Sequence, residues 1–126
     1  MSCSLVGSEM CIRDRIDKDN NATLSYGVMG GQYQPVGQVH VLNNMIDYGM
    51  GPQEALSFPR AFHFNNIYKL EKTVDKEIFD GLKEVGHNVE YIDGTHGGGQ
   101  AIKINRSEGD LLGGSDPRKD GYAKGY

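Results

Sequence analysis

The sequence predicts a layered protein of mixed helices and strands, of the α/β or α+β class. A strand-like run is followed by stretches with the apolar spacing of helices, and alternating strand patterns return near the end. No internal repeat interrupts this order. The chain has 126 residues, which is enough for one domain with a modest core.

The composition is that of a globular protein, with 37% hydrophobic and 24% charged residues. Glycine is the outlier at 18 residues, about twice the usual share of roughly 7%. The net charge is −4 and no basic stripe is present, which disfavours nucleic-acid or anionic-membrane partners. No stretch approaches the about 20 apolar residues of a membrane-spanning helix.

The first fifteen residues, MSCSLVGSEMCIRDR, differ from the rest. They have no clear helix or strand period, and they contain both cysteines, Cys3 and Cys11. The run resembles translated sequencing-adapter sequence, which recurs at the ends of reading frames assembled from short reads. We therefore expect residues 1–15 to be a non-native artefact, with an ordinary flexible N-terminus as the alternative. Residues 16–126 then contain no cysteine for a disulfide, a metal or a nucleophile.

The first half of the remaining chain predicts a turn, a strand and two helices. Residues 16–21 indicate a hairpin turn, residues 22–28 a strand, and Gly30-Gly31 a tight turn into a helix with Pro35 in its first turn. Gly49 suits the end of that helix. Residues 51–56 predict a short second helix that ends before Pro59. The expected apolar stripe of the longer helix is Val36, Val39, Leu42 and Ile46.

The second half predicts a third helix and several strands. Residues 62–69 are strand or irregular, and residues 74–85 form a helix that stops at Gly86. Residues 89–92 and 101–105 alternate like strands, and residues 111–114 return as a hairpin partner. The apolar stripe expected for the third helix is Ile78, Leu82 and Val85, with Phe79 beside it.

Gly30 and Gly31 are the candidate catalytic residues. Two glycines between a strand and a helix free adjacent backbone N–H groups to point outward, and the helix dipole adds positive potential there. An oxyanion hole needs such preorganised donors where negative charge develops. A purely structural tight turn is the alternative.

Other polar clusters are better explained as structural. The segment Asp17–Asn21 lacks the glycine and glutamate of a calcium loop, and the glycines after His96 lack the lysine of a phosphate loop. The four histidines have no metal-ligand spacing. We expect Ser115–Arg118 to be a turn with an internal Asp–Arg pair, and Arg60 to bind carbonyls or a carboxylate.

An ordered set of short motifs over about residues 20 to 126 resembles the C-terminal part of the γ-glutamyltranspeptidase small subunit. No single motif is specific, but their order over about a hundred residues is. The motifs are Gly27-Val-Met-Gly30-Gly31, Asn44-x-x-Asp47-x-Gly49-Met50, Gln53-Glu-Ala55, Pro59-Arg60, Glu71, Gly86-His87, Gly99-Gln-Ala-Ile102, and Gly114-Ser-Asp-Pro-Arg118 through Gly125-Tyr126.

The resemblance implies an N-terminal nucleophile hydrolase, whose fold is an αββα sandwich. Such enzymes are precursors that cut themselves into a large and a small subunit, and the new N-terminal Thr attacks a γ-glutamyl amide. Gly30 and Gly31 fall on the glycine pair that holds the oxyanion. The implied partners are the large subunit, the rest of the small subunit and a γ-glutamyl substrate such as glutathione. No cofactor is implied, and the family suggests a periplasmic or extracellular location.

The chain departs from the family in two respects. No Thr-x-His segment is present, and Thr23, Thr73 and Thr95 stand in the wrong surroundings, so we expect the chain alone to be inactive. Val28-Met29 and Gln32 flank the glycine pair where many members have Ser-Pro and Ser. The substrate therefore stays open between glutathione and another γ-glutamyl or glutaryl amide. The alternative function is a non-catalytic binding domain or a pseudogene remnant, in which case no Thr-x-His codons lie upstream.

Overall fold

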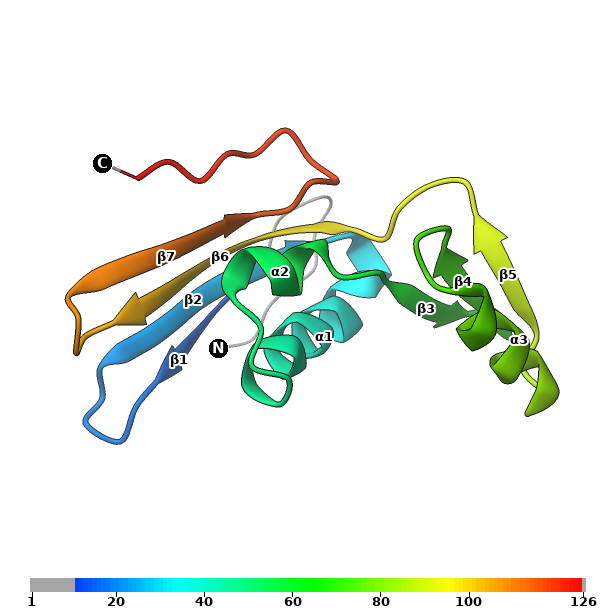
Figure 1. Ribbon diagram of the computed structural model, residues 1–126, viewed down its shortest axis with the longest axis horizontal. Coiled ribbons are helices and arrows are strands. Elements are labelled where there is room, and N and C mark those ends of the chain that lie inside the picture. The colour runs from blue at the N-terminus through cyan, green and yellow to red at the C-terminus, as the bar shows by residue number, and fades with distance from the viewer. Residues whose placement is uncertain (1–10, 126) are drawn as a thin grey trace. The chain divides into compact units, whose positions relative to one another are not determined.

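The computed structural model describes residues 11–125, which divide into two compact units (Figure 1). The first unit comprises the residues up to Ser57 and those from Gly97 onward, and the second comprises Phe58–His96. Each unit is built on a sheet of its own. The α+β class predicted from the sequence is confirmed.

The first unit contains a four-stranded antiparallel sheet in the order β1-β2-β6-β7. The strands are β1 (Cys11–Ile16), β2 (Ala22–Met29), β6 (Gly98–Asn105) and β7 (Asp110–Ser115). The predicted hairpin turn after residue 16 is confirmed, because the Asp17 carboxylate accepts the N–H groups of Asp19 and Asn21 at 2.9 Å each. Because β2 and β6 pair at the centre, the end of β2 lies inside the sheet and not at its edge.

Strand β1 is one element that the sequence pattern does not predict. Residues 11–16 lack the alternation of a strand, yet they pair with β2 in antiparallel register, from Cys11 opposite Val28 to Ile16 opposite Ala22. Pairing with an existing neighbour can order a segment whose own pattern is weak. The foreign origin of residues 1–15 stays a prediction, and residues 1–10 lie outside the described part of the chain.

Two helices, α1 (Gln34–Ile46) and α2 (Pro52–Ser57), pack on the same face of this sheet. Val28 of β2 and Gly99 of β6 are paired, so they point to the same face of the sheet. On that face Gly37 of α1 lies against Val28, and Gly99 lies against Leu56 of α2. β7 also lies close to α2, because a Cβ added to Gly114 would lie 2.7 Å from the backbone nitrogen of Gln53. Buried apolar residues of this unit are Leu24, Tyr26, Val28, Tyr33, Val41, Ala55, Leu56 and Ala101.

The helix predicted after the glycine pair is confirmed, but the prediction of its buried stripe is wrong. Val36, Val39 and Ile46 are 47%, 58% and 45% exposed. The buried positions of α1 are instead Gln34, Gly37, Gln38, Val41 and Asn44. The apolar spacing correctly indicated a helix, but the face that meets the sheet is largely polar.

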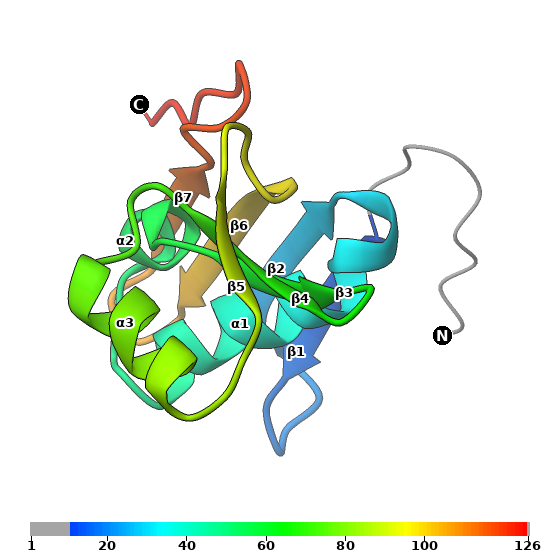
Figure 2. The same cartoon turned by 90° about the vertical axis from the view of Figure 1, so that its right-hand side faces the viewer.

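The second unit contains a three-stranded sheet in the order β3-β4-β5. β3 (Ala61–Phe64) and β4 (Ile67–Glu71) form a hairpin whose two turn residues, Asn65 and Asn66, both have positive φ. β4 and β5 (Val89–Ile92) are parallel and are joined through α3 (Lys76–Glu84), as Figure 2 shows. Asparagine tolerates this backbone region better than other residues with a side chain, which suits a two-residue hairpin loop.

Helix α3 packs through two of the four apolar residues predicted for its stripe. Phe79 and Leu82 contact the buried cluster of Leu70, Val74 and Val89, and the Phe79 ring stacks on Tyr91 at 4.5 Å between centroids. Ile78 and Val85 are 54% and 73% exposed, so their assignment to the buried stripe is wrong. A narrow contact with one small sheet accommodates only part of the stripe. Gly86, with φ of 96°, ends the helix region as predicted.

Candidate active-site turn

The glycine pair lies where β2 ends and the helical segment begins. Gly30 has φ of 134° and Gly31 has φ of 57°, both in the region that side-chain-bearing residues rarely adopt. Gly31 opens the short 3₁₀ helix η1 (Gly31–Tyr33), which continues directly into α1. The turn is closed by the Tyr33 N–H, which donates to the Gly30 carbonyl at 3.1 Å.

The two glycines differ in the space around them. A Cβ on Gly30 would lie 2.9 Å from the Gly97 Cα, whereas a Cβ on Gly31 would meet nothing within 4 Å. Gly97 also has positive φ, and its Cβ would lie 2.2 Å from the Met29 carbonyl oxygen. Gly30 is therefore required by close backbone packing, while Gly31 is required by its backbone conformation alone and faces open space.

Both glycines are exposed. Among the turn and loop hydrogen bonds of residues 11–125, none is donated by the N–H group of Gly30 or Gly31 to a backbone carbonyl. They stand at the amino end of η1 and α1, where the helix dipole is positive. Because the first turn of α1 contains no acidic residue, no carboxylate there cancels this potential. The turn is therefore suited to hold a small anion or a developing oxyanion.

Sequence reasoning missed the two residues that support this turn, Gly97 and Tyr33. The Tyr33 ring is 3% exposed and fills the space left by Gly37 and Gly97, whose Cβ atoms would approach it to 2.5 and 2.9 Å. The glycine run before β6 was the available signal, since a glycine run marks close backbone approach as well as phosphate binding.

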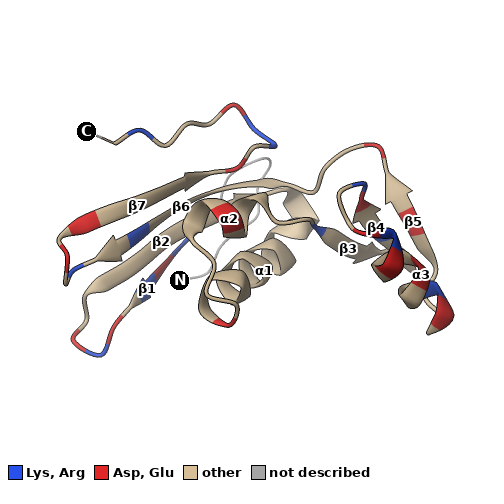
Figure 3. Cartoon of the chain, in the orientation of Figure 1, with Lys and Arg blue, Asp and Glu red and all other residues tan. Residues whose placement is uncertain are grey.

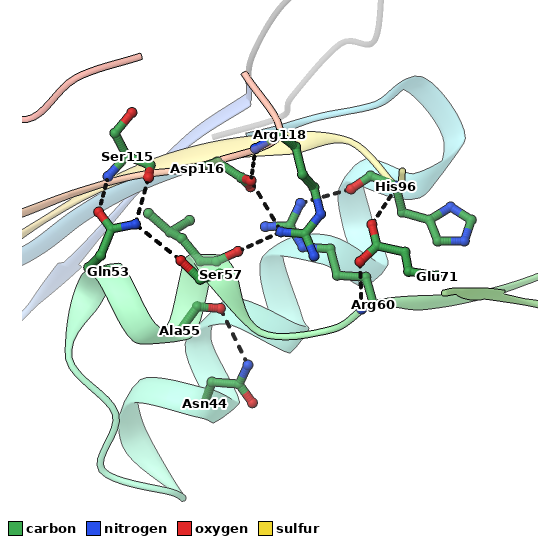
Figure 4. A network of polar contacts seen from close by, with 11 residues as sticks. Asn44, Gln53, Ala55, Ser57, Arg60, Glu71, His96, Ser115, Asp116 and Arg118 are labelled. Carbon is green, nitrogen blue, oxygen red and sulfur yellow. Dashed lines mark hydrogen bonds and ion pairs between the residues drawn. The ribbon is translucent and has the colours of Figure 1, made fainter. Parts of the chain in front are cut away.

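Several other motif residues of the first unit hold its layers together (Figure 4). The Gln53 amide of α2 donates to the Ser115 carbonyl at 2.8 Å and accepts the Ser115 N–H at 3.0 Å, as a strand neighbour would. Arg118 Nη1 donates to the Leu56 carbonyl at 2.9 Å and to Asp116 Oδ1 at 3.1 Å. The predicted structural turn with its internal Asp–Arg pair is confirmed.

In the second unit, the Glu71 carboxylate links the two ends of the segment (Figure 4). It accepts the Arg60 N–H at 3.0 Å and the His96 N–H at 2.8 Å. The Arg60 guanidinium donates to the His96 carbonyl at 2.8 Å, as predicted for this arginine. His96 Nε2 lies 2.9 Å from the Lys69 carbonyl, which makes it a structural histidine.

Thr23, the threonine of the first unit within residues 11–125, does not lie at this turn. Thr23 lies near the opposite end of β2, where its hydroxyl donates to the Arg15 carbonyl at 3.1 Å. Desolvation raises the pKa of Tyr26, a buried residue of the sheet. Among residues 11–125, no three His, Cys, Asp or Glu side chains are grouped to hold a metal ion, and no helix is long and apolar enough to cross a membrane.

An antiparallel sheet with helices on one face and an exposed glycine turn at the end of a central strand agrees with part of the N-terminal nucleophile hydrolase fold, which the solved relatives share. The chain belongs to the γ-glutamyltranspeptidase family, because the Gamma-glutamyltranspeptidase model matches residues 12–126. The resemblance seen in the ordered motifs is thereby confirmed.

Three relatives illustrate this membership. The chain is 38% identical over 118 residues to the glutathione hydrolase-like YwrD proenzyme of Bacillus subtilis, and 34% over 116 residues to the oxamate amidohydrolase proenzyme of Klebsiella pneumoniae. Each match covers 86% of this chain and 22% of the relative. The crystal structure of cephalosporin acylase from Bacillus halodurans superposes with a TM-score of 0.78 at 36% identity, over 86% of this chain and 22% of that one. The chain thus spans about a fifth of the length of the relatives it matches.

Proposed function

We propose that this chain is the C-terminal part of an amidohydrolase that cleaves γ-glutamyl amides, and that it supplies the oxyanion-binding amides. The observation that carries the proposal is the turn at Gly30 and Gly31, two exposed glycines of positive φ at the amino end of a helix. The family membership supports the same assignment. The nucleophile belongs to the part of the family's chain that precedes these residues.

The chemistry is acyl transfer to a threonine. The hydroxyl oxygen of the upstream Thr attacks the amide carbonyl, and its proton passes to the nearby amino group and then to the leaving amine. The carbonyl oxygen becomes an oxyanion in the tetrahedral intermediate, where the Gly30 and Gly31 amides hold it. The C–N bond breaks to leave an ester on the Thr, and water hydrolyses that ester to release the acid.

The relatives' names support an amide substrate and leave its acyl group to be determined. They describe a glutathione hydrolase-like protein, an oxamate amidohydrolase and an acylase. Each of these substrates presents a carbonyl that acquires negative charge during attack, which is the feature the glycine turn addresses. We propose a γ-glutamyl amide, with glutathione as the first compound to assay.

The proposal includes the rest of a precursor as a partner. The matched relatives are named proenzymes, which supports a precursor that is processed into subunits. We also propose that residues 1–15 replace native sequence, which a long read across the 5′ end of the gene in its source DNA tests. Codons for residues 1–15 within a genuine open reading frame would contradict this part.

Two matched glycine substitutions test the role of the turn in the full-length product of the source gene. Gly31→Ala and Gly109→Ala both place a Cβ in open space at positive φ, 57° and 74°. Both therefore add similar backbone strain, of about 1–2 kcal/mol. We expect Gly31→Ala to lower kcat for hydrolysis of a γ-glutamyl amide by about tenfold or more, because the strain displaces an oxyanion donor. Gly109→Ala retains kcat. Equal kcat values for the two variants would remove the turn from the mechanism.

A further inference from the structure

Helix α1 has an outer stripe that is apolar and uncharged. We define the α1 outer stripe as Pro35, Val36, Val39 and Ile46, all of them exposed. The 13 residues of α1 include no Asp, Glu, Lys or Arg, and Figure 3 shows the helix without a charged residue along its length. Pro35, Val36, Val39 and His40 form a shallow, open depression at the start of the stripe.

The orientation of α1 is fixed by its opposite face, so the stripe cannot turn inward. Asn44 Nδ2 donates to the Ala55 carbonyl at 3.5 Å, and the side chains of Gln34 and Gln38 are buried. Gly37 sits so close to the sheet that its Cβ would lie 2.8 Å from Val28 Cγ1. A rotation that buried Val39 would break the bond of Asn44 and force a larger residue into the position of Gly37.

Apolar residues that gather on the exposed side of a helix mark a surface for contact with another polypeptide. We propose that the α1 outer stripe is the docking surface for the remaining polypeptide of the same precursor. This inference rests on the proposed function and names where that partner binds. The matched relatives are proenzymes of which this chain spans 22%, so most of the family's length lies outside the matched residues and is available as the occupant.

The location of the stripe favours this occupant over a second copy of the chain. Pro35 and Val36 lie within about one and a half helical turns of Gly31. A polypeptide seated on the stripe therefore approaches the two exposed amides, where an upstream nucleophile is required. An uncharged apolar surface also suits a permanent contact, since obligate interfaces are more apolar than transient ones.

The test compares Val39→Asp with Val85→Asp in the full-length product of the source gene. Val39 lies in α1 and Val85 directly follows α3, and the two are 58% and 73% exposed. Val39→Asp places a charge in the proposed interface and lowers the thermal midpoint by about 5 °C or more, whereas Val85→Asp shifts it by about 1 °C or less. Val39→Ala lowers the thermal midpoint by a smaller amount, and it keeps the test usable if the aspartate variant fails to assemble.

Two results would overturn the proposal. One is equal thermal midpoints for the two aspartate variants of the full-length product. The other is a native gene product that consists of this 13.9 kDa chain alone or of its symmetric dimer. A failure of the proposed function gives a different result from a failure of this inference. The unmodified product then shows no γ-glutamyl hydrolysis, but the thermal midpoints of the two aspartate variants still differ.

Discussion

Helices α1 and α3 have similar apolar spacing, but they differ in the residues that they expose to solvent. Five of the nine residues of α3 are charged, and its exposed Lys76 and Asp80 form an ion pair at 2.6 Å. In α1 no residue is charged, and the face that packs on the sheet is the more polar one. Apolar spacing therefore identifies a helix, but it does not say whether the apolar face is buried inside the same chain.

The surroundings of the two helices differ in the same way. The layers around α1 and α2 are joined by buried contacts, such as Arg118 with Asp116, whose side chains are 7% and 0% exposed. The three-stranded unit around α3 carries its ion pairs at the surface, as with Lys72 and Asp93 at 2.6 Å. Buried contacts are costly to break, and surface pairs contribute little. This difference can be tested by mutation.

The largest expected effect is that of Asp116→Ala. The change leaves the buried Arg118 guanidinium without its carboxylate and lowers the free energy of unfolding by about 3–5 kcal/mol. The matched change at the surface, Asp80→Ala, removes the partner of Lys76 and leaves the free energy of unfolding within experimental error. Urea denaturation of each variant measures both effects, and similar losses would remove the distinction between the two kinds of ion pair.

A smaller effect on stability is expected when one glycine in α3 and one in α1 are each replaced by alanine. Gly81→Ala in α3 places its Cβ in open space and raises stability by about 0.5–1 kcal/mol through helix propensity. Gly37→Ala in α1 brings a Cβ to 2.5 Å from the buried Tyr33 ring and lowers stability by about 1–2 kcal/mol. Thermal unfolding of the two variants measures the signs, and stabilisation by Gly37→Ala would show that α1 is loosely packed.

The smallest expected effect concerns two carboxylates. Backbone N–H groups, that of Asn21 first, lower the pKa of Asp17 below 3.8, whereas a hydrogen bond from Lys72 lowers the pKa of Asp93. Both folded-state pKa values are depressed, so both groups stabilise the protein above the unfolded pKa and lose that contribution as pH falls through the folded one.

Salt separates the two causes. In about 1 M NaCl, screening returns the pKa of Asp93 toward 3.8, while the pKa of Asp17 stays low because its neutral donors move with the turn. Carboxyl chemical shifts followed by NMR titration measure both values. An equal response of the two pKa values to salt would contradict the assigned causes.

The sequence predicted most elements of the fold and the position of the glycine turn, because turns and helix ends depend on local chemistry. Gly30-Gly31, Pro35, Gly49 and Gly86 marked boundaries that the structure confirms. It did not predict β1, which is ordered by pairing with β2, or the exposure of Val39 and Val85. These features depend on contacts between distant segments. The support of the turn by Tyr33 and Gly97 spans more than sixty residues and was missed for the same reason.

The central claim is that these residues supply the amides of an enzyme whose nucleophile lies upstream. Intact-mass analysis and N-terminal sequencing of the native gene product test it most directly. The account predicts two associated polypeptides, the smaller of which begins with Thr and contains residues 16–126. A single 13.9 kDa polypeptide that begins at Met1 would contradict it.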